Sequence, residues 1–282
     1  MKKNTALVLE GGGLRGAYTA GALSWLIDNG VSFDHAYGIS TGAVYLSTYL
    51  MGSKENLKYF STNGITDKRI VGLKPLLRCG HIVDYEFLFD VIMAKELQYD
   101  ISPLKDIKTD AKIGVYVLED GKTEYLPVQD ITMQELKAST SLPIIGKVFE
   151  SHGKHLLDGG ITDMIPIEEA ISDGCDRYLI ITTKPGDYVR KPAKDFVVKV
   201  MKRTYPQCEN ISYDYKIRHL NYQKQIDIIK GLQEENKAIY VYPSKHSKVT
   251  RLGGSQEDLE ALYDLGYADM ENQKETILAL LK

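Results

Sequence analysis

The residues best placed to do chemistry lie at 38–42, where the chain reads Gly-Ile-Ser-Thr-Gly. The residues before Ser40 predict a short strand over 35–39, and the apolar run after it predicts a helix over 41–50. A Gly-x-Ser-x-Gly sequence at a strand-to-helix corner is the pattern of a nucleophile elbow, in which a sharp turn exposes the serine hydroxyl. The helix that begins there directs its positive dipole end at the serine, which favours developing negative charge. The pattern is short enough to occur by chance, so it needs support from other segments.

A second candidate is the loop at 11–16, Gly-Gly-Gly-Leu-Arg-Gly, which follows an apolar run at 6–9 and precedes a helical pattern over 17–27. Strand, loop, helix and strand make a right-handed βαβ unit whose second strand leads to Ser40. Because glycines carry no side chains, the backbone N–H groups of the loop can point at the oxyanion that forms on an attacked ester. Arg15 adds a positive charge beside that place.

The same loop also matches Gly-x-Gly-x-x-Gly, the fingerprint of dinucleotide binding, through Gly11, Gly13 and Gly16. That fold expects an acidic residue about 20 positions further on, at the tip of the second strand. In this chain Asp34 precedes the second strand and Ser40 occupies its tip. Both interpretations use glycine for close backbone approach, and a nucleotide-binding module using residues 11–16 is the alternative function.

An acid suited to Ser40 is Asp158, which ends an apolar run and is followed by Gly159 and Gly160. Strand ends share one crevice in a doubly wound sheet, so we expect Ser40 and Asp158 to meet although 118 positions separate them. A carboxylate within hydrogen-bond reach of a serine and shielded from water can act as its base.

The six histidines of the chain are weaker candidates for that base. A triad of the α/β-hydrolase kind needs the chain order serine, acid, histidine, which only His219 and His246 satisfy. Neither lies in a Gly-rich or strand-end context, so we interpret both as ordinary surface or core residues. His152 and His155 lie in a hairpin turn without a third ligand at metal spacing, which predicts a structural role.

The composition is typical of a soluble cytoplasmic protein. A chain of 282 residues with 43% hydrophobic content can bury a large core, and its net charge of −3 gives no overall attraction to nucleic acid. Cys79, Cys175 and Cys208 are odd in number and far apart, which excludes a disulfide framework or a zinc cluster and favours a reducing compartment. No apolar run approaches the roughly 18 residues of a membrane span.

The remaining segments predict further elements of an α/β fold. We expect an amphipathic helix over 84–97, hairpins over 113–128 and 148–157, and a helix opened by a capping box at Thr132 and Glu135. Later segments predict a helix over 165–172, strands over 178–183 and 238–242, and a helix capped by Ser255 and Asp258.

Two segments are expected to build the walls of the site. Residues 52–81 are irregular and rich in lysine, and we expect them to cover it. In residues 184–230, lysine and arginine outnumber aspartate and glutamate by 11 to 5, and five tyrosines are interleaved with them. Such a segment can lie at a lipid interface, or it can be a solvated helical surface with its tyrosines packed inward.

The three ordered motifs at 11–16, 38–42 and 158–160 resemble the patatin-like phospholipase family. The Ala138-Ser139 pair and Pro143, shortly before the aspartate, are also similar to that family. The resemblance covers roughly residues 5–172, which would form the acyl hydrolase domain. Residues 173–282 resemble the C-terminal extension of a bacterial branch, with strands and helices that pack on the core.

The resemblance implies a fold, an activity and a partner. The fold would be a three-layer α/β/α sandwich with a central, largely parallel sheet. The activity would be that of a serine esterase, a phospholipase A or lysophospholipase-like acyl hydrolase, acting through an acyl-enzyme without metal or cofactor. The partner would be a lipid or acyl-ester substrate, with peripheral membrane contact and no nucleic acid. A catalytically silent lipid-binding protein is a further alternative.

The resemblance also implies a role for each motif residue. Ser40 would be the nucleophile and Asp158 its base, in a dyad without histidine. The oxyanion hole would be formed by the backbone amides of Gly11, Gly12, Gly13 and Leu14, supported by Arg15. The motifs would depend on Gly16, Gly38, Gly42, Gly159 and Gly160. Many relatives carry histidine in the helix after the glycine loop, where this chain has Tyr18 and Thr19; that departure concerns loop packing more than chemistry.

Overall fold

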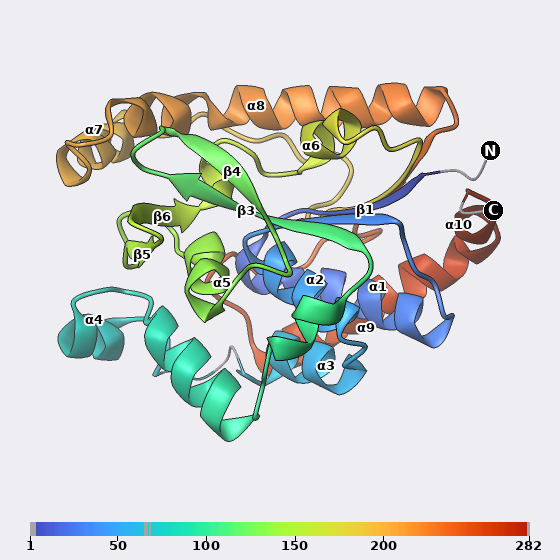
Figure 1. Cartoon of the computed structure of the whole chain (residues 1–282), viewed down its shortest axis with the longest axis horizontal. Coiled ribbons are helices and arrows are strands. Elements are labelled where there is room, and N and C mark those ends of the chain that lie inside the picture. The colour runs from blue at the N-terminus through green and yellow to red at the C-terminus, as the bar shows by residue number, and fades with distance from the viewer. Residues whose placement is uncertain (1–3, 65–66, 68, 281–282) are drawn as a thin grey trace.

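The structure is a computed structural model of the chain, and it describes residues 4–64, 67 and 69–280. Helices cover both faces of one central sheet, as Figure 1 shows, so the predicted three-layer α/β/α sandwich is confirmed. The order of strands across the sheet is β5-β6-β3-β2-β1-β7-β8, and β4 pairs with β3. The strands are β1 (Thr5–Leu9), β2 (His35–Ile39), β3 (Asp110–Val117), β4 (Lys122–Pro127), β5 (Phe149–Ser151), β6 (Lys154–Asp158), β7 (Arg177–Ile181) and β8 (Ala238–Val241).

The centre of the sheet is parallel. Strands β3, β2, β1, β7 and β8 are parallel neighbours, whereas β4 and β6 run antiparallel to β3 and β5 runs antiparallel to β6. A parallel strand with helices on both faces needs apolar residues throughout, and every residue of β1 is buried. Both predicted hairpins are confirmed as β3–β4 and β5–β6.

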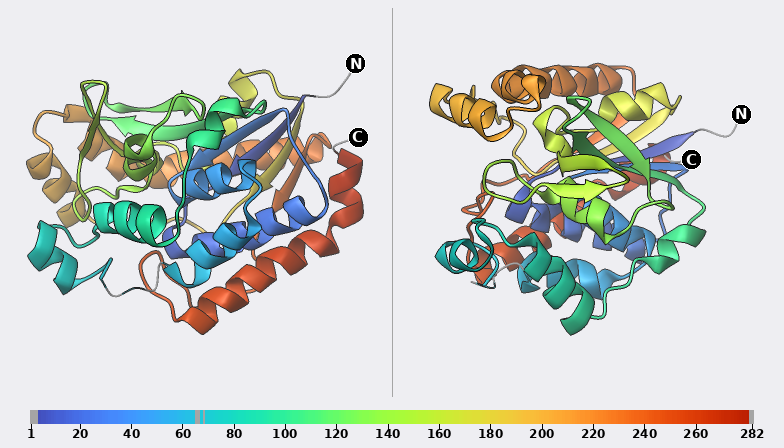
Figure 2. Two further views of the ribbon diagram at one scale, coloured as in Figure 1. Left: turned by 60° about the horizontal axis from the view of Figure 1, so that its bottom comes forward. Right: turned by 60° about the vertical axis from the view of Figure 1, so that its left-hand side comes forward.

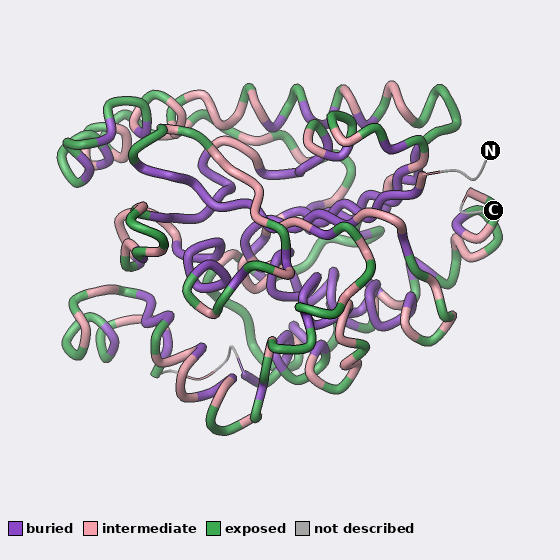
Figure 3. Tube along the Cα trace, viewed as in Figure 1, coloured by how far each residue is buried: buried purple, intermediate pink, exposed green. Residues whose placement is uncertain are grey.

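Two layers of helices enclose this sheet. On one face lie α1 (Ala17–Asp28), α2 (Thr41–Leu50), α3 (Lys54–Thr62), α5 (Met133–Thr140) and α9 (Gln256–Asn272). On the other lie α6 (Ile167–Ser172), α7 (Asp195–Thr204) and the long α8 (Glu209–Glu234), whose outer side is exposed in Figure 3. A last helix, α10 (Lys274–Leu280), follows α9. The capping boxes predicted for α5 and α9 are both present.

Helices α1 and α9 pack with their backbones almost in contact. A Cβ atom on Gly21 of α1 would overlap the carbonyl of Tyr263, and one on Gly266 of α9 would overlap the carbonyl of Tyr18. Two buried hydrogen bonds cross the same interface, from Tyr18 to Asp269 at 3.0 Å and from Tyr263 to Ser24 at 2.7 Å. The C-terminal part of the chain is therefore packed tightly on the first βαβ unit.

The segment 52–81 was predicted to be irregular, and that prediction was wrong for most of its described residues. It forms α3 and a second short helix, α4 (Leu73–Cys79), which Figure 2 shows at the periphery of the molecule. In α3, Leu57 and Phe60 are buried three residues apart, and the polar residues around them, Lys54, Glu55 and Lys58, hid this helical spacing. Residues 65, 66 and 68 of the segment lie outside the described residues.

The helix predicted over 84–97 is present as η3 (Phe87–Glu96), and its hydrogen bonds are of the wider π type. At its end the amide of Leu97 donates to the carbonyl of Ile92 at 3.0 Å, a spacing of five residues. Helices of this type are rare and are frequent at functional sites.

Candidate active site

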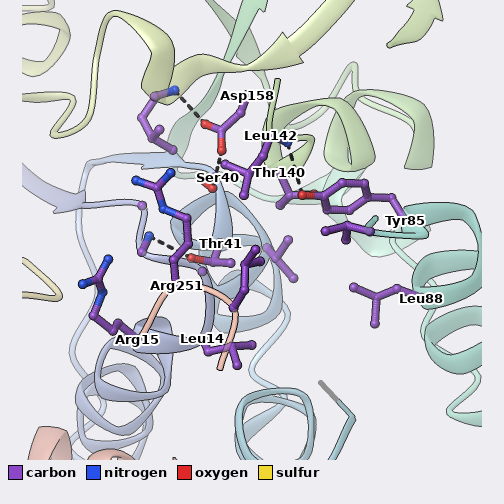
Figure 4. Close-up of a pocket in the computed structure, with 18 of the residues that line it drawn as sticks. Leu14, Arg15, Ser40, Thr41, Tyr85, Leu88, Thr140, Leu142, Asp158 and Arg251 are labelled. Atoms are coloured by element: carbon purple, nitrogen blue, oxygen red, sulfur yellow. Dashed lines mark hydrogen bonds between the residues drawn. The ribbon is translucent and has the colours of Figure 1, made fainter. Parts of the chain in front are cut away.

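Ser40 lies at the corner between β2 and α2, and its hydroxyl donates a hydrogen bond to Asp158. Ser40 Oγ is 2.7 Å from Asp158 Oδ2, and Figure 4 shows the two side chains pointing at one another. Only 7% of Ser40 and 4% of Asp158 is exposed, so little water competes for this bond. The backbone of Ser40 has φ 57° and ψ −129°, a conformation that costs a residue with a side chain about 1–3 kcal/mol.

The two residues meet across β3. Ile39 pairs with Gly114 of that strand, and Asp158 pairs with Val115, the next residue along. Strand β2 runs parallel to β3 and β6 runs antiparallel to it. The two strands therefore approach this place from opposite ends of the sheet. The predicted meeting of two strand ends is observed, but β6 runs antiparallel to β3 and is not one of the parallel strands of a doubly wound sheet.

Close backbone approach explains the glycines around Ser40. A Cβ atom on Gly11 would lie 2.7 Å from Ser40 Cβ, and one on Gly42 would lie 2.9 Å from the carbonyl oxygen of Glu10. A Cβ atom on Gly159 would lie 2.7 Å from the carbonyl oxygen of Gly114. Side chains do not fit at these positions, so the glycines allow the serine loop, the glycine loop and the aspartate loop to converge.

Asp158 is held from both sides and sits in a low-dielectric place. Its Oδ1 accepts from the Gly160 amide at 2.7 Å, and its own amide donates to the carbonyl of Ser141 at 2.9 Å. Burial raises the pKa of Asp158 above its ordinary value, against the opposing effects of the Ser40 and Gly160 hydrogen bonds and of the positive charges on Arg218 and Arg251. A carboxylate with a raised pKa is a stronger base once it is ionised.

Ser139 positions Ser40, a role that the sequence analysis did not assign. Its Oγ accepts from the Ser40 amide at 3.2 Å and donates to the carbonyl of Gly114 at 2.8 Å. The serine thereby fixes the backbone of the elbow against β3. Its position in the 138–143 stretch was the available signal, because that stretch ends a helix shortly before Asp158.

The glycine loop lies beside Ser40, but three of its four predicted amide donors already have acceptors. The amides of Gly11, Gly12 and Leu14 donate to Met164 O, Thr41 Oγ1 and Arg251 O at 3.3, 3.1 and 3.0 Å. Gly13 has a positive φ of 59°, and its amide has no acceptor among the described residues. The role of these amides as an oxyanion hole stays a prediction.

Glu10 anchors the start of the glycine loop. Its carboxylate accepts from the Thr183 amide at 2.7 Å and from Thr183 Oγ1 at 2.9 Å, and it forms a buried ion pair with Lys184. Burial alone would raise the pKa of Glu10, but the Lys184 charge and these hydrogen bonds outweigh it, and the pKa is lowered. The end of β1 is thereby tied to the end of β7.

The pocket that contains Ser40 has two chemically different walls. The apolar wall comes from α3, η3 and the residues between them, namely Phe60, Ile70, Val71, Val83, Leu88, Phe89, Ile92 and Met93. The opposite wall carries the positively charged residues Arg15, Lys184, Arg190, Arg218 and Arg251. Both segments that were predicted to build the walls contribute to them, and no histidine of the described chain lines the pocket.

Asp34, the acid considered for dinucleotide binding, lies at the other end of β1 from the glycine loop. Its Oδ2 accepts from the Thr5 amide at 3.1 Å and from Thr5 Oγ1 at 2.9 Å. A ribose-binding acid must lie at the carboxyl end of the second strand, beside the loop. The nucleotide-binding alternative therefore lacks its acid at the required place.

Comparison with known proteins gives two family matches. The model described as patatin-like phospholipase matches residues 7–171, more than half of the chain, and a domain of unknown function (DUF6363) matches residues 208–282.

The proteins similar to this chain include one curated relative and one solved structure. The uncharacterized protein YjjU of Escherichia coli (strain K12) is 29% identical over 192 residues, which are 66% of this chain and 54% of that protein. The chain thus matches about half the length of this curated relative. The crystal structure of VipD from Legionella pneumophila aligns over 98% of this chain and 67% of VipD, with a TM-score of 0.54 and 14% identity. At that identity the likeness concerns the fold alone.

Proposed function

The chain belongs to the patatin-like phospholipase family, and from this premise we propose that it hydrolyses lipid acyl esters with Ser40 as nucleophile and Asp158 as its base. The observation that carries the proposal is the 2.7 Å hydrogen bond between Ser40 Oγ and Asp158 Oδ2 at a buried, strained corner. A serine needs an adjacent base to become nucleophilic, and no histidine lies in the described part of the pocket to serve instead.

In the proposed reaction, Asp158 takes the proton of Ser40 as Oγ attacks the ester carbonyl. The tetrahedral intermediate collapses to an acyl-serine when Asp158 returns that proton to the leaving alcohol. Water then attacks the acyl-serine with Asp158 again as base, which releases the fatty acid and restores the serine. The Gly13 amide is available to the oxyanion, and the Gly12 amide becomes available if it releases the Thr41 hydroxyl.

The two walls of the pocket support an amphipathic substrate. An acyl chain in contact with the apolar wall is removed from water, at roughly 0.8 kcal/mol for each buried CH₂ group. The charged wall lies on the other side of Ser40, where the alcohol part of the ester would be placed.

Contact with a membrane surface is part of the proposal, and we place it at α4 rather than at residues 184–230. Leu73 and Leu77 of this helix are 77% and 88% exposed, and Ile70 and Val71, just before it, line the pocket. Of the described helices, none is both long and apolar enough to cross a bilayer. A cytoplasmic location is proposed on the three free cysteines, because such thiols suit a reducing compartment.

The experiment that tests the activity is labelling with a fluorescent fluorophosphonate, followed by a panel of phospholipids and simple acyl esters. We expect the parent protein to be labelled and active, and Ser40→Ala to be neither. Asp158→Asn should lose at least a hundredfold of the activity while remaining folded by circular dichroism. Ser53→Ala is the matched control, since the Ser53 side chain caps no amide of α3.

Four outcomes would contradict this function. Equal labelling of the parent and Ser40→Ala would exclude Ser40 as the activated serine. An active Asp158→Asn protein would exclude the dyad. Vesicle binding without turnover by a folded parent would favour the silent lipid-binding alternative, and thermal stabilisation by NAD would favour the nucleotide-binding one.

A further inference from the structure

The four arginines of the charged wall have no acidic partner among the described residues. Arg15 belongs to the glycine loop, and Arg190, Arg218 and Arg251 come from the C-terminal part of the chain; no ion pair in the described chain joins any of them to a carboxylate. The Nε atoms of Arg15, Arg190 and Arg218 are buried without a hydrogen-bond acceptor. A buried, charged donor without an acceptor destabilises a fold, so these Nε atoms call for an explanation.

The charges of Arg190, Arg218 and Arg251 act on one another and on the dyad. Burial and the charges of Arg190 and Arg251 together lower the pKa of Arg218 to about 10, although Tyr215 and Asp158 oppose the decrease. A Cβ atom on Gly160 would lie 3.7 Å from Arg218 Nη2, so this guanidinium lies beside the aspartate loop. Figure 4 shows Arg251 beside Ser40.

The carboxylates near the cluster are already used. Glu10 is paired with Lys184, which cancels one charge of each sign. Asp158 accepts from Ser40 and Gly160, so its oxygens are occupied in the state that the structure describes. Arg190, Arg218 and Arg251, together with Arg15 of the glycine loop, therefore bring four positive charges to the pocket against a single carboxylate, and that carboxylate belongs to the dyad.

Two tyrosines hold the guanidinium groups in place. The guanidinium of Arg190 lies 4.9 Å from the ring centre of Tyr222, and that of Arg218 lies 4.9 Å from the ring centre of Tyr215. Such stacking occupies the flat face of a guanidinium and leaves its N–H edge for an oxyanion. This gives a specific use to the interleaved tyrosines and basic residues of 184–230, at the pocket rather than on the outer surface.

We propose that Arg190, Arg218 and Arg251 form a subsite for the phosphate group of the substrate, next to the ester that Ser40 attacks. The inference rests on the proposed hydrolase function and adds a substrate class to it: acyl esters whose phosphate is exposed and anionic, such as phosphatidate. Planar guanidinium groups bind phosphate oxygens through paired N–H donors. A phosphomonoester, with a charge approaching −2, neutralises the cluster better than a zwitterionic phosphocholine, whose outer ammonium would add a positive charge to it.

The subsite makes residues beyond the patatin-like match part of the active site. Arg218 lies on α8 and Arg251 in the loop before α9, both within the second matched region, 208–282. The carbonyl of Arg251 also accepts from the Leu14 amide at 3.0 Å. One residue of the extension thus contacts the glycine loop through its backbone and faces the pocket with its side chain.

The test compares full-length parent and Arg218→Met on three substrates with the same acyl chain: phosphatidate, phosphatidylcholine and a neutral p-nitrophenyl ester. We expect the parent to prefer phosphatidate over phosphatidylcholine. The ratio of kcat/KM for phosphatidate to that for the neutral ester should fall at least tenfold in Arg218→Met, chiefly through KM. Arg218→Lys, which keeps the charge, should recover part of the ratio, and the exposed Arg203→Met is the matched control.

Several results would overturn the subsite. A parent without preference for phosphatidate would do so, as would an Arg218→Met protein that loses the same factor on all three substrates, since Arg218 would then act through Asp158. Inorganic phosphate should inhibit the parent competitively and inhibit Arg218→Met much less. Activation of neutral-ester hydrolysis by phosphate would instead assign the cluster to free phosphate as a separate ligand.

Failure of the hydrolase function itself gives a different pattern. In that case Ser40 is not labelled and no ester is turned over. The anion site is then judged by thermal unfolding alone: phosphate that stabilises the parent and Arg203→Met but not Arg218→Met supports it. Equal stabilisation of all three proteins means that phosphate binds elsewhere, and the proposal falls.

Discussion

At the scale of single residues, the ionisation of Asp158 sets the acid limit of the proposed reaction, because only the carboxylate can accept the proton of Ser40. Burial raises the pKa of this carboxyl group, and the charges of Arg218 and Arg251 hold it down in part. Of the neighbouring groups, Ser40 and the Gly160 amide stabilise the ionised form by hydrogen bonds. The carboxylate is therefore lost at a higher pH than in an exposed aspartate.

The corresponding prediction concerns the pH profile of kcat/KM on a neutral ester. Activity should fall as pH decreases through an apparent pKa above the ordinary value of 3.8. Arg218→Met removes a positive charge that favours the carboxylate, so its acid limb should lie at higher pH than that of the parent. Arg203→Met should leave the limb in place. If the acid limb of the pH profile lay at the same pH in Arg218→Met and in the parent, the charge of Arg218 would have no effect on the pKa of Asp158.

Part of the site was predictable residue by residue, and part was not. Ser40, Asp158 and the glycines carry local patterns, because a sharp turn or a close backbone approach restricts the residue types nearby in sequence. Ser139 lies in a recognisable stretch, but its role depends on contacts with Ser40 and β3. Arg190, Arg218 and Arg251 carry no such pattern, since their roles depend on contacts across the fold. Arg218 is one of 35 lysines and arginines, and only its position beside the Gly160 loop distinguishes it.

At the scale of elements, the glycine loop depends on the tie between the ends of β1 and β7. The ion pair of Glu10 and Lys184 is buried, with 0% and 3% of the side chains exposed. Removing one partner of such a pair leaves an uncompensated buried charge, which costs about 3–5 kcal/mol. Loss of either partner alone should therefore destabilise the fold at the base of the candidate active site.

We predict that Glu10→Gln lowers the free energy of unfolding by about that amount in urea denaturation. The double variant Glu10→Gln with Lys184→Met should recover a large part, because it removes the unpaired charge. Since the pKa of Glu10 is lowered in the fold, its stabilisation is present above the ordinary pKa of 4.5 and is lost as pH falls through the lowered value. Equal stability of parent and Glu10→Gln at pH 7 would show that the pair contributes nothing.

Helix α4 carries the predicted contact with membranes. Leu77→Ser should reduce binding of the full-length protein to phospholipid vesicles severalfold in a sedimentation assay, because it removes an 88% exposed apolar side chain from the surface beside the pocket. Leu220→Ser is the control, as this leucine of α8 is 58% exposed on the opposite layer. If Leu220→Ser weakened binding and Leu77→Ser did not, residues 184–230 would be the membrane surface.

The elements themselves were predicted unevenly. Buried parallel strands and hairpins have strong periodic signals, and β1, β2 and both hairpins were predicted close to their bounds. Strand order has no local signal, so the antiparallel entry of β6 beside β3 was missed although the hairpin that contains it was found. Helix α3 was not predicted because its apolar face is narrow and is interrupted by polar residues, lysines among them.

At the scale of the whole molecule, the sheet continues across the predicted boundary at residue 172. Strand β7 pairs with β1 along its whole length, and β8 pairs with β7, so the last two strands extend the sheet that holds Ser40. Helix α9 covers α1 through the contact of Gly21 with Tyr263. The partner of Glu10, Lys184, also lies beyond the boundary.

We therefore predict that residues 5–172 do not fold alone. Without the rest of the chain, β1 becomes an edge strand with unpaired backbone groups, the apolar face of α1 is uncovered and Glu10 is buried without its cation. The fragment should aggregate on expression, and co-expression of residues 173–282 should restore a soluble complex that fluorophosphonate labels at Ser40. A monomeric 5–172 fragment with cooperative thermal unfolding would show instead that residues 173–282 are not needed for this domain to fold. Since Arg218 and Arg251 come from the extension, such a fragment would also be expected to lose any preference for a phosphate-bearing ester.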